Sequence, residues 1–199
     1  MQPGGAELNV GCPGGGCPGG GCPGGAPVAP ALRWTGPEPD LTVDQLDAAE
    51  RCETLLQDTV DAIDPAPAWQ EAAPRAGARL PRPGRGSEVL WYVTRGRDLV
   101  TVVSLPRRAV LAGVVERHWR RLGWTITALN AGPDRPGVAA TTRDGYRLAL
   151  CFGELGEAGL TARSPGVARS ERIPVPPAAG VRAPAPLPYV CCTYWSAWA

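Results

Sequence analysis

Residues 104–123 read SLPRRAVLAGVVERHWRRLG, and this stretch decides the fold. It carries the signals that start and stop one helix. Ser104 can cap the first exposed N–H groups, and Pro106 fits the first turn because its missing N–H would have no partner there. Gly123 can enter the left-handed conformation that commonly ends a helix. We therefore predict a helix over residues 106–122, with a buried face at helical spacing made of Val110, Leu111, Val114, Val115, His118, Trp119 and Leu122.

Strand-like runs rich in β-branched and aromatic residues lie on both sides of this helix. Before it, residues 88–94 and 99–103 are predicted to form a hairpin around a turn at residues 95–98. After it, alternation and turn residues predict further strands at residues 124–129, 138–142, 146–152 and 160–163.

An earlier helix is predicted to begin just after Asp40 and to end at Asp64-Pro65. Thr42 would be its N-cap, because Gln45 follows three residues later in a capping-box pattern. Its apolar residues recur on one face, which we expect to cover the sheet. That inner face consists of Leu46, Ala49, Cys52, Leu56, Thr59, Val60 and Ile63.

Two cysteines of the folded region are expected to lie apart. Alternation along residues 146–152 places Cys151 beside Arg147, on the face opposite Leu148. If both helices cover the apolar face, Cys52 and Cys151 point to opposite sides of the sheet, and a disulfide is disfavoured because its geometry requires facing Cβ atoms. Packing of the first helix on the far face would remove this argument.

These elements predict a single α+β domain over residues 40–165, in the order α-β-β-α-β-β-β(-β). We expect a mainly antiparallel sheet of about five or six strands with both helices on one face. Residues 65–87 are expected to be an irregular linker within the domain. Residues 1–39 form a Gly/Pro/Cys low-complexity segment, expected to be disordered, and residues 166–199 a Pro/Ala-rich tail. The aromatic end of that tail is open to three interpretations: a docking peptide, a membrane-interface anchor, or a segment without selected function.

The charge balance argues against a nucleic-acid partner. The chain has 20 basic residues, all of them arginine, and 19 acidic residues, for a formal net charge of +1. Domains that bind nucleic acid are usually strongly basic, so we interpret the arginines of the 106–122 helix as a solvated face. No apolar run approaches the ~20 residues that span a bilayer. The first residues lack the basic start and apolar core of a signal peptide.

The sequence Gly-Cys-Pro-Gly-Gly occurs three times between Gly11 and Gly25. Its cysteines, Cys12, Cys17 and Cys22, are weak metal candidates because thiolates bind zinc and Cu(I). Structural zinc sites, however, usually space cysteines more closely and supply four ligands. We therefore favour a flexible low-complexity segment over a metal site.

Catalytic patterns are lacking in the sequence. His118 is the only histidine, and without a second histidine or a carboxylate at fixed spacing it is expected to be a half-buried structural residue. The chain has no Gly-x-Ser-x-Gly, no phosphate-binding loop and no evident carboxylate pair. We expect no enzyme activity, no catalytic residue and no cofactor.

The pattern of Cys52, residues 89–92, residues 118–124, residues 144–146 and residues 162–165 resembles a group of small actinobacterial envelope proteins, often lipoproteins. The resemblance covers residues 41–166. It implies an extracytoplasmic α+β domain of unknown function. This chain differs in having no signal peptide or lipobox as written, and in having Gly166 where those proteins often carry a cysteine.

The expected function is therefore that of a cell-envelope or secreted domain that binds a protein or a small ligand. Two alternatives remain open: a thiol or metal protein that uses the cysteine repeat, and a cytoplasmic protein of unknown activity.

Overall fold

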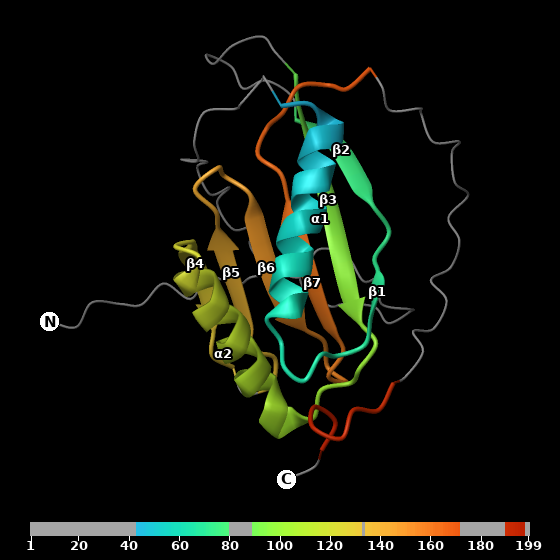
Figure 1. Ribbon diagram of the computed structural model, residues 1–199, viewed down its shortest axis with the longest axis vertical. Helices are drawn as coiled ribbons and strands as arrows, with labels where there is room; N and C mark the ends of the chain where they lie inside the picture. Colours follow the sequence, from blue (N-terminus) through green and yellow to red (C-terminus); the bar gives the residue numbers. More distant parts are fainter. Residues whose placement is uncertain (1–42, 80–88, 133, 172–189, 198–199) are drawn as a thin grey trace, which may run out of the picture. The chain divides into compact units, whose positions relative to one another are not determined.

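A computed structural model describes residues 43–79, 89–132, 134–171 and 190–197. All of them belong to the compact unit that begins at Pro37. The predicted α+β class is confirmed, with both helices in front of one sheet (Figure 1). The elements are α1 (Gln45–Asp61), β1 (Trp69–Glu71), β2 (Arg75–Arg79), β3 (Leu90–Leu99), α2 (Leu105–Arg121), β4 (Thr125–Asn130), β5 (Gly137–Thr141), β6 (Arg147–Phe152) and β7 (Ala158–Arg163).

The strands form one sheet in the order β1-β3-β7-β6-β5-β4, and β2 also pairs with β3. The pairings between these strands are antiparallel, in agreement with the predicted mainly antiparallel sheet. Strands β1 and β2 share one edge of β3, since β1 lies opposite residues 97–99 and β2 lies opposite residues 90–94. The edge of the sheet next to β3 is therefore formed by two short strands, β1 and β2, placed one after the other along β3.

The core lies between the sheet and the two helices. Helix α1 packs on β3 and β7, and α2 packs on β4 and β5. Trp119 of α2 is fully buried, and its Nε1 donates a 3.0 Å hydrogen bond to Thr59 Oγ1 of α1, which joins the two helices. The largest fully buried apolar side chains include Leu55, Leu56, Leu99, Leu111, Leu148, Leu150 and Leu160.

The observed ends of α2 agree with the prediction from sequence, whereas the observed start of α1 differs from it. The N-cap of α1 is Asp44, whose Oδ1 accepts hydrogen bonds from the backbone N–H groups of Leu46 (2.7 Å) and Asp47 (3.1 Å). The predicted cap, Thr42, lies outside the described residues, and its assignment is wrong by two residues. The helix begins after Asp44 because this carboxylate accepts two of the first-turn N–H groups that have no partner within the helix.

Helix α2 buries a narrower face than its sequence predicted. Leu111, Val115 and Trp119 are buried, but Val110 and Leu122 are 38 % and 43 % exposed. The inner-face assignment of these two residues is wrong. Because α2 packs mainly on β4 and β5 at one side of the sheet, residues on the flanks of its apolar stripe meet no strand.

The predicted hairpin at residues 88–103 is wrong, because β3 continues straight through residues 95–98. None of the glycines with positive φ in the described part of the chain lies there. Gly96 is needed for close approach instead: a Cβ on it would lie 3.1 Å from the Ala72 Cβ and 3.3 Å from the Leu160 carbonyl oxygen. The predicted returning strand is reduced to an isolated bridge between Thr101 and Val190.

The predicted irregular linker, residues 65–87, contains β1 and β2, so the sheet has seven strands rather than five or six. These strands are short and carry few β-branched residues, which is why the sequence pattern missed them. They form because they complete the edge of β3. Gly77 in β2, for example, lies under the ring of Tyr92 of β3.

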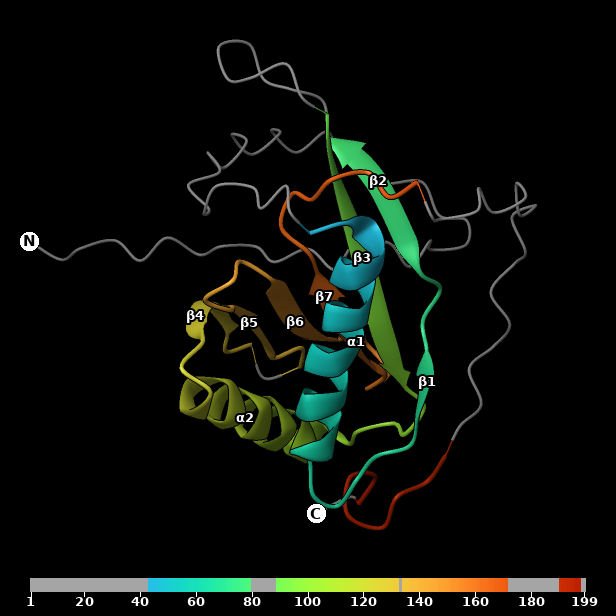
Figure 2. The ribbon, with the colours of Figure 1, turned by 45° about the horizontal axis from the view of Figure 1, so that its top comes forward.

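The C-terminal aromatic segment, residues 190–197, packs against the domain beside the lower ends of α1 and α2 (Figure 2). Trp195 is 0 % exposed, and its Nε1 donates a 2.6 Å hydrogen bond to the Pro65 carbonyl oxygen. Ser104, the N-cap residue of α2, makes no side-chain bond to its own helix; its Oγ donates to the Ala197 carbonyl oxygen at 2.6 Å. The segment is therefore part of the folded unit.

Candidate functional site

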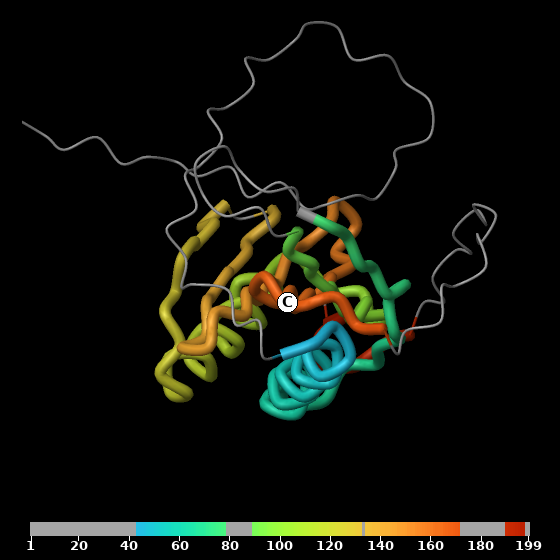
Figure 3. The backbone as a smooth tube through the Cα atoms, turned by 90° about the horizontal axis from the view of Figure 1, so that it is seen from above, coloured from blue at the N-terminus to red at the C-terminus, as the bar shows by residue number. Residues whose placement is uncertain are grey.

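The face of the sheet that points away from the helices is the candidate site. In Figure 3 α1 and α2 lie on the same side of the strands, and no described helix lies on the other side. Antiparallel sheets commonly leave one face to solvent. We call this surface the open face; its residues alternate with the buried ones along β3, β7, β6 and β5.

One row of residues crosses the open face perpendicular to the strands. Arg75 lies opposite Thr94, Thr94 opposite Arg163, and Arg163 opposite Arg147. We call Arg75, Arg163 and Arg147 the arginine row. Since neighbouring strands are about 4.7–4.9 Å apart, Arg147 and Arg163 occupy adjacent backbone positions, while Arg75 stands two strands away from Arg163.

Beside the arginine row the open face is lined by small side chains. We call this area the small-residue floor. Its members are Gly96, which is buried, and Thr161, Ala149, Ala139, Gly159 and Gly137, which are half-buried.

Arg163 is held by an aromatic ring. Its guanidinium carbon lies 3.9 Å from the centre of the Tyr92 ring. The hydroxyl end of that ring approaches Gly77, where a Cβ would lie 2.5 Å from the Tyr92 hydroxyl oxygen. A stacked guanidinium uses its flat face for the ring, so its N–H edges remain directed outward. Among the described residues no carboxylate forms an ion pair with Arg163.

Asp98 is the acidic residue of β3 on the open face. Burial raises the pKa of its carboxyl group, and the positive charge of Arg75 acts in the opposite direction. Asp98 thus offsets the charge of Arg75. Arg147 and Arg163 lie at the other end of the arginine row.

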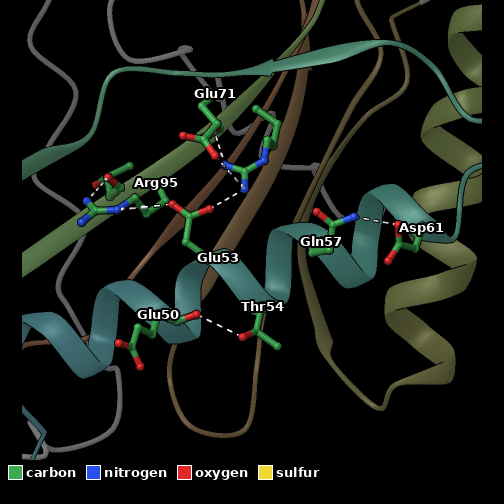
Figure 4. Close-up of polar contacts among 10 residues, drawn as sticks. Glu50, Glu53, Thr54, Gln57, Asp61, Glu71 and Arg95 are labelled. Carbon is green, nitrogen blue, oxygen red and sulfur yellow. Dashed lines mark hydrogen bonds and ion pairs between the residues drawn. The ribbon is translucent and has the colours of Figure 1, made fainter.

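A second charged cluster lies on the covered face, between α1 and β3 (Figure 4). Glu53 of α1 contacts Arg97 at 2.5 Å and Arg95 at 3.4 Å. The Arg97 guanidinium also stacks over Trp69 at 4.6 Å, and Glu71 lies 3.9 Å from it. Because Arg97 is only 5 % exposed, this cluster fastens α1 to β3 rather than meeting a ligand.

The cysteines predicted as metal candidates, Cys12, Cys17 and Cys22, lie outside the described residues, and their assignment stays a prediction. In the described ranges no group of three His, Cys, Asp or Glu side chains could hold a metal ion. Cys52 is buried in the core, and desolvation raises the pKa of its thiol to about 12. Cys151 alternates with buried Leu150 and Phe152, so the two thiols lie on opposite sides of the sheet, as predicted, and no disulfide can join them.

His118 is half-buried, as predicted. Burial lowers the pKa of its imidazole; the nearby Arg121 charge lowers it further, and Asp58 of α1 partly offsets both. On the solvent side of α2, Arg120 forms an i, i+4 ion pair with Glu116 at 2.8 Å.

Replacing His118 with glutamine is expected to flatten the pH dependence of stability. The folded pKa lies below the ordinary 6.5, so the unfolded chain binds the proton first as the pH falls. Stability should therefore be full above about pH 6.5 and decrease as the pH drops through the folded pKa. Urea unfolding at pH values on both sides of this window measures the slope for both proteins. Equal slopes would contradict the prediction.

Comparisons with known proteins give one partial likeness. No family model and no curated protein matches the sequence. A crystal structure of a DUF4853 family protein from Actinomyces odontolyticus is similar, with 13 % sequence identity and a TM-score of 0.39, over 69 % of this chain and 76 % of that chain. We draw no function from a likeness of this degree. Neither described helix is both long enough and apolar enough to cross a membrane.

Proposed function

We propose that this domain is a non-enzymatic binding protein that holds another protein on the open face of its sheet. The observation that carries the proposal is the arginine row, which separate strands bring together on a face that no described helix covers. Arginine is enriched among the residues that contribute most to protein–protein binding, so a row of arginines on a sheet face suits a docking surface.

The chemistry of the open face supports recognition rather than catalysis. Arginine supplies fixed positive charge and several N–H donors, but its pKa is too high for it to exchange protons near neutral pH. The small-residue floor beside the arginine row allows a partner to approach the strands closely. Both features favour a docking surface.

A photo-crosslinking amino acid in place of Ala149, at the centre of the small-residue floor, tests this proposal in the native host. We expect one discrete adduct, which disappears when Arg147 and Arg163 are both changed to glutamate. The same crosslinker in place of Ala109, on the exposed side of α2, is the matched control and should give none. Adducts from Ala109 alone, or from neither position, would show that the open face is not the binding surface.

We also propose that the domain acts in the cell envelope or outside the cell. The resemblance of residues 41–166 to small actinobacterial envelope proteins supports this location. Fractionation of the native host, with identification of the N-terminal peptide of the recovered protein, tests it. Recovery with the envelope or in the medium is expected; recovery only with the soluble cytoplasmic fraction would overturn the proposed location.

A further inference from the structure

We propose that one end of this domain binds at the surface of a lipid bilayer, with a few apolar side chains inserted among the headgroups. That end is made of the start of α2, the turn between β6 and β7, and the C-terminal segment 190–197. Its exposed large apolar side chains are Leu105, Leu155, Val190 and Tyr194, which we call the apolar end. The inference does not depend on the open face, because none of these residues lies in a strand of the sheet.

Backbone hydrogen bonds bring the three segments of the apolar end together just before α2. The N–H of Val103 donates to the Gly156 carbonyl oxygen at 2.9 Å, and the N–H of Ser104 donates to the Trp195 carbonyl oxygen at 2.9 Å. Figures 1 and 2 both show the red C-terminal segment beside the start of α2. The exposed apolar side chains therefore come from separate parts of the sequence but lie at one end of the domain.

Leu155 is the most exposed member of the apolar end, and it lies on a turn that is held firmly. Its side chain is 80 % exposed. The turn is closed by Gly156, whose φ of 92° is a conformation that other residues rarely adopt. Arg108, which is 7 % exposed, donates to the carbonyl oxygens of Val103 (3.3 Å) and Glu154 (3.2 Å). A side chain on a turn that is already ordered loses little entropy when it binds.

Other exposed apolar side chains are scattered over the described part of the molecule. Val89 precedes β3, Leu129 lies in β4, and Leu122 follows the last residue of α2. Val110 and Leu105 are five positions apart in α2, so they lie on different sides of the helix. Single exposed apolar residues are normal, whereas a group of them at one place marks a contact with a protein or a membrane.

The composition of the C-terminal stretch favours a bilayer. Residues 183–199 contain no charged residue and include Tyr189, Tyr194, Trp195 and Trp198. Tyrosine and tryptophan are enriched where hydrocarbon meets headgroups, because their rings are apolar and carry one polar group. A short uncharged segment binds a bilayer only weakly by itself. The fold strengthens the contact by adding two leucines from other segments.

The charged groups of the apolar end suit the headgroup layer. The Arg107 guanidinium lies 4.2 Å from the centre of the Tyr194 ring, so it can reach lipid phosphates while the ring lies at the hydrocarbon boundary. Glu154, next to Leu155, pairs with Arg135 at 3.6 Å. The carboxylate that approaches the bilayer with Leu155 therefore has a cation beside it.

Apolar insertion, rather than attraction to anionic lipid, is expected to drive the binding. The segments 104–108, 134–135 and 153–157 contain three arginines and three acidic residues. An end without excess positive charge gains little from a negative surface, so the free energy comes from apolar area removed from water.

Flotation of the full-length chain with vesicles of phosphatidylcholine alone measures this contact. We expect the protein to float with the vesicles, and Leu155→Ser to lower its partition coefficient about tenfold, because one leucine side chain then stays out of the hydrocarbon. Leu105→Ser should lower it less, because Leu105 is only 45 % exposed. Leu122→Ser is the matched control: it removes a leucine that is 43 % exposed at the other end of α2, and should leave the partition coefficient unchanged.

Vesicle charge separates apolar insertion from adsorption through arginine. Replacing part of the phosphatidylcholine with phosphatidylglycerol, or raising the salt concentration, should change the partition coefficient less than about threefold. Binding that requires phosphatidylglycerol and disappears at high salt would show that an arginine-rich surface, such as the exposed side of α2, binds the lipid instead. The proposal would then be wrong.

NMR with phosphatidylcholine bicelles locates the contact on the full-length chain. Bicelles that contain a nitroxide-labelled lipid broaden the amide signals of residues close to the bilayer. We expect broadening at Leu105, Leu155, Gly156 and Tyr194, and none at Leu122. Uniform broadening, or broadening confined to other residues, would contradict the proposal.

Two results would identify a different occupant of the apolar end. If the chain does not float, and a photo-crosslinking amino acid in place of Leu155 gives a discrete adduct with another protein in the native host, the apolar end binds that protein. If sedimentation without lipid shows a dimer that Leu155→Ser abolishes, the occupant is a second copy. Failure to float overturns the proposal even when neither result is found. The crosslink from Ala149, which tests the open face, is independent of all these outcomes.

Discussion

Replacing Trp195 with alanine is expected to lower the free energy of unfolding by about 3–5 kcal/mol, the range for truncation of a buried aromatic side chain. Trp195 is 0 % exposed and belongs to the same apolar core as the helices and strands. Its backbone carbonyl oxygen accepts a 2.9 Å hydrogen bond from the N–H of Ser104 at the start of α2. The alanine variant therefore leaves a cavity where the C-terminal segment meets the domain. Urea unfolding of the full-length chain measures the change.

Two further variants separate the contributions to this effect. Trp195→Phe keeps an aromatic ring but loses the hydrogen bond from Nε1 to the Pro65 carbonyl oxygen, and should cost about 1 kcal/mol beyond any loss of packing. Leu155→Ala, at a residue that is 80 % exposed, should lie within about 0.5 kcal/mol of wild type. A loss for Trp195→Ala no larger than that for Leu155→Ala would show that the C-terminal segment does not contribute to the folded unit.

The parts of the fold that sequence predicted well are those with a complete local signal. Helix α2 begins and ends within one residue of its prediction because Ser104 and Gly123 flank it. Strand β6 was predicted because Leu148, Leu150 and Phe152 alternate with residues of the opposite face. Spacing of this kind is set by the geometry of a single helix or strand. Such an element can therefore be predicted without knowing which other elements it packs against.

The errors lie where distant residues decide the local structure. Residues 95–98 contain Gly96 and charged side chains, which is typical of a turn, yet they continue β3. Glu53 of α1 supplies the partner that lets Arg95 and Arg97 lie on the covered face. A repeat of arginine at every second position of a strand was the signal that could have indicated this, because such residues share one face.

The candidate site depends on strand register and was therefore not predictable from spacing alone. Alternation placed Arg147 on the open face, which the structure confirms. That Arg163 lies directly beside it follows only from the pairing of β6 with β7, and that Arg75 joins the row follows from β2, which was not foreseen. The open face is thus built from strands that are far apart in the sequence and become neighbours only in the folded sheet.

Replacing Glu53 with glutamine is the second change for which we expect a large effect, a loss of about 2–3 kcal/mol, somewhat below the range for breaking a fully buried ion pair. The reduction is expected because the Glu53 side chain is 37 % exposed, whereas that of Arg97 is 6 % exposed. Without Glu53 the buried guanidinium keeps, among the described carboxylates, the more distant Glu71, at 3.9 Å, besides its hydrogen bond to the Gly96 carbonyl oxygen. Its Nε has no hydrogen-bond acceptor among the described residues. Thermal or urea unfolding of the full-length variant gives the loss.

The control for charge alone is Glu116→Gln, which breaks the pair between Glu116 and Arg120 on the solvent side of α2 and should cost only about 0.3–0.5 kcal/mol.

A double-mutant cycle shows that the loss arises from the buried arginine. Arg97→Met replaces the guanidinium with an apolar side chain that can still pack on Trp69, and such replacements of buried charges are often close to neutral. In the Arg97→Met background, Glu53→Gln should therefore cost less than about 1 kcal/mol, because no buried positive charge is left unpaired. An equal cost of Glu53→Gln in both backgrounds would show that Glu53 stabilises the fold through Arg95 or through α1 alone, and not by pairing with Arg97.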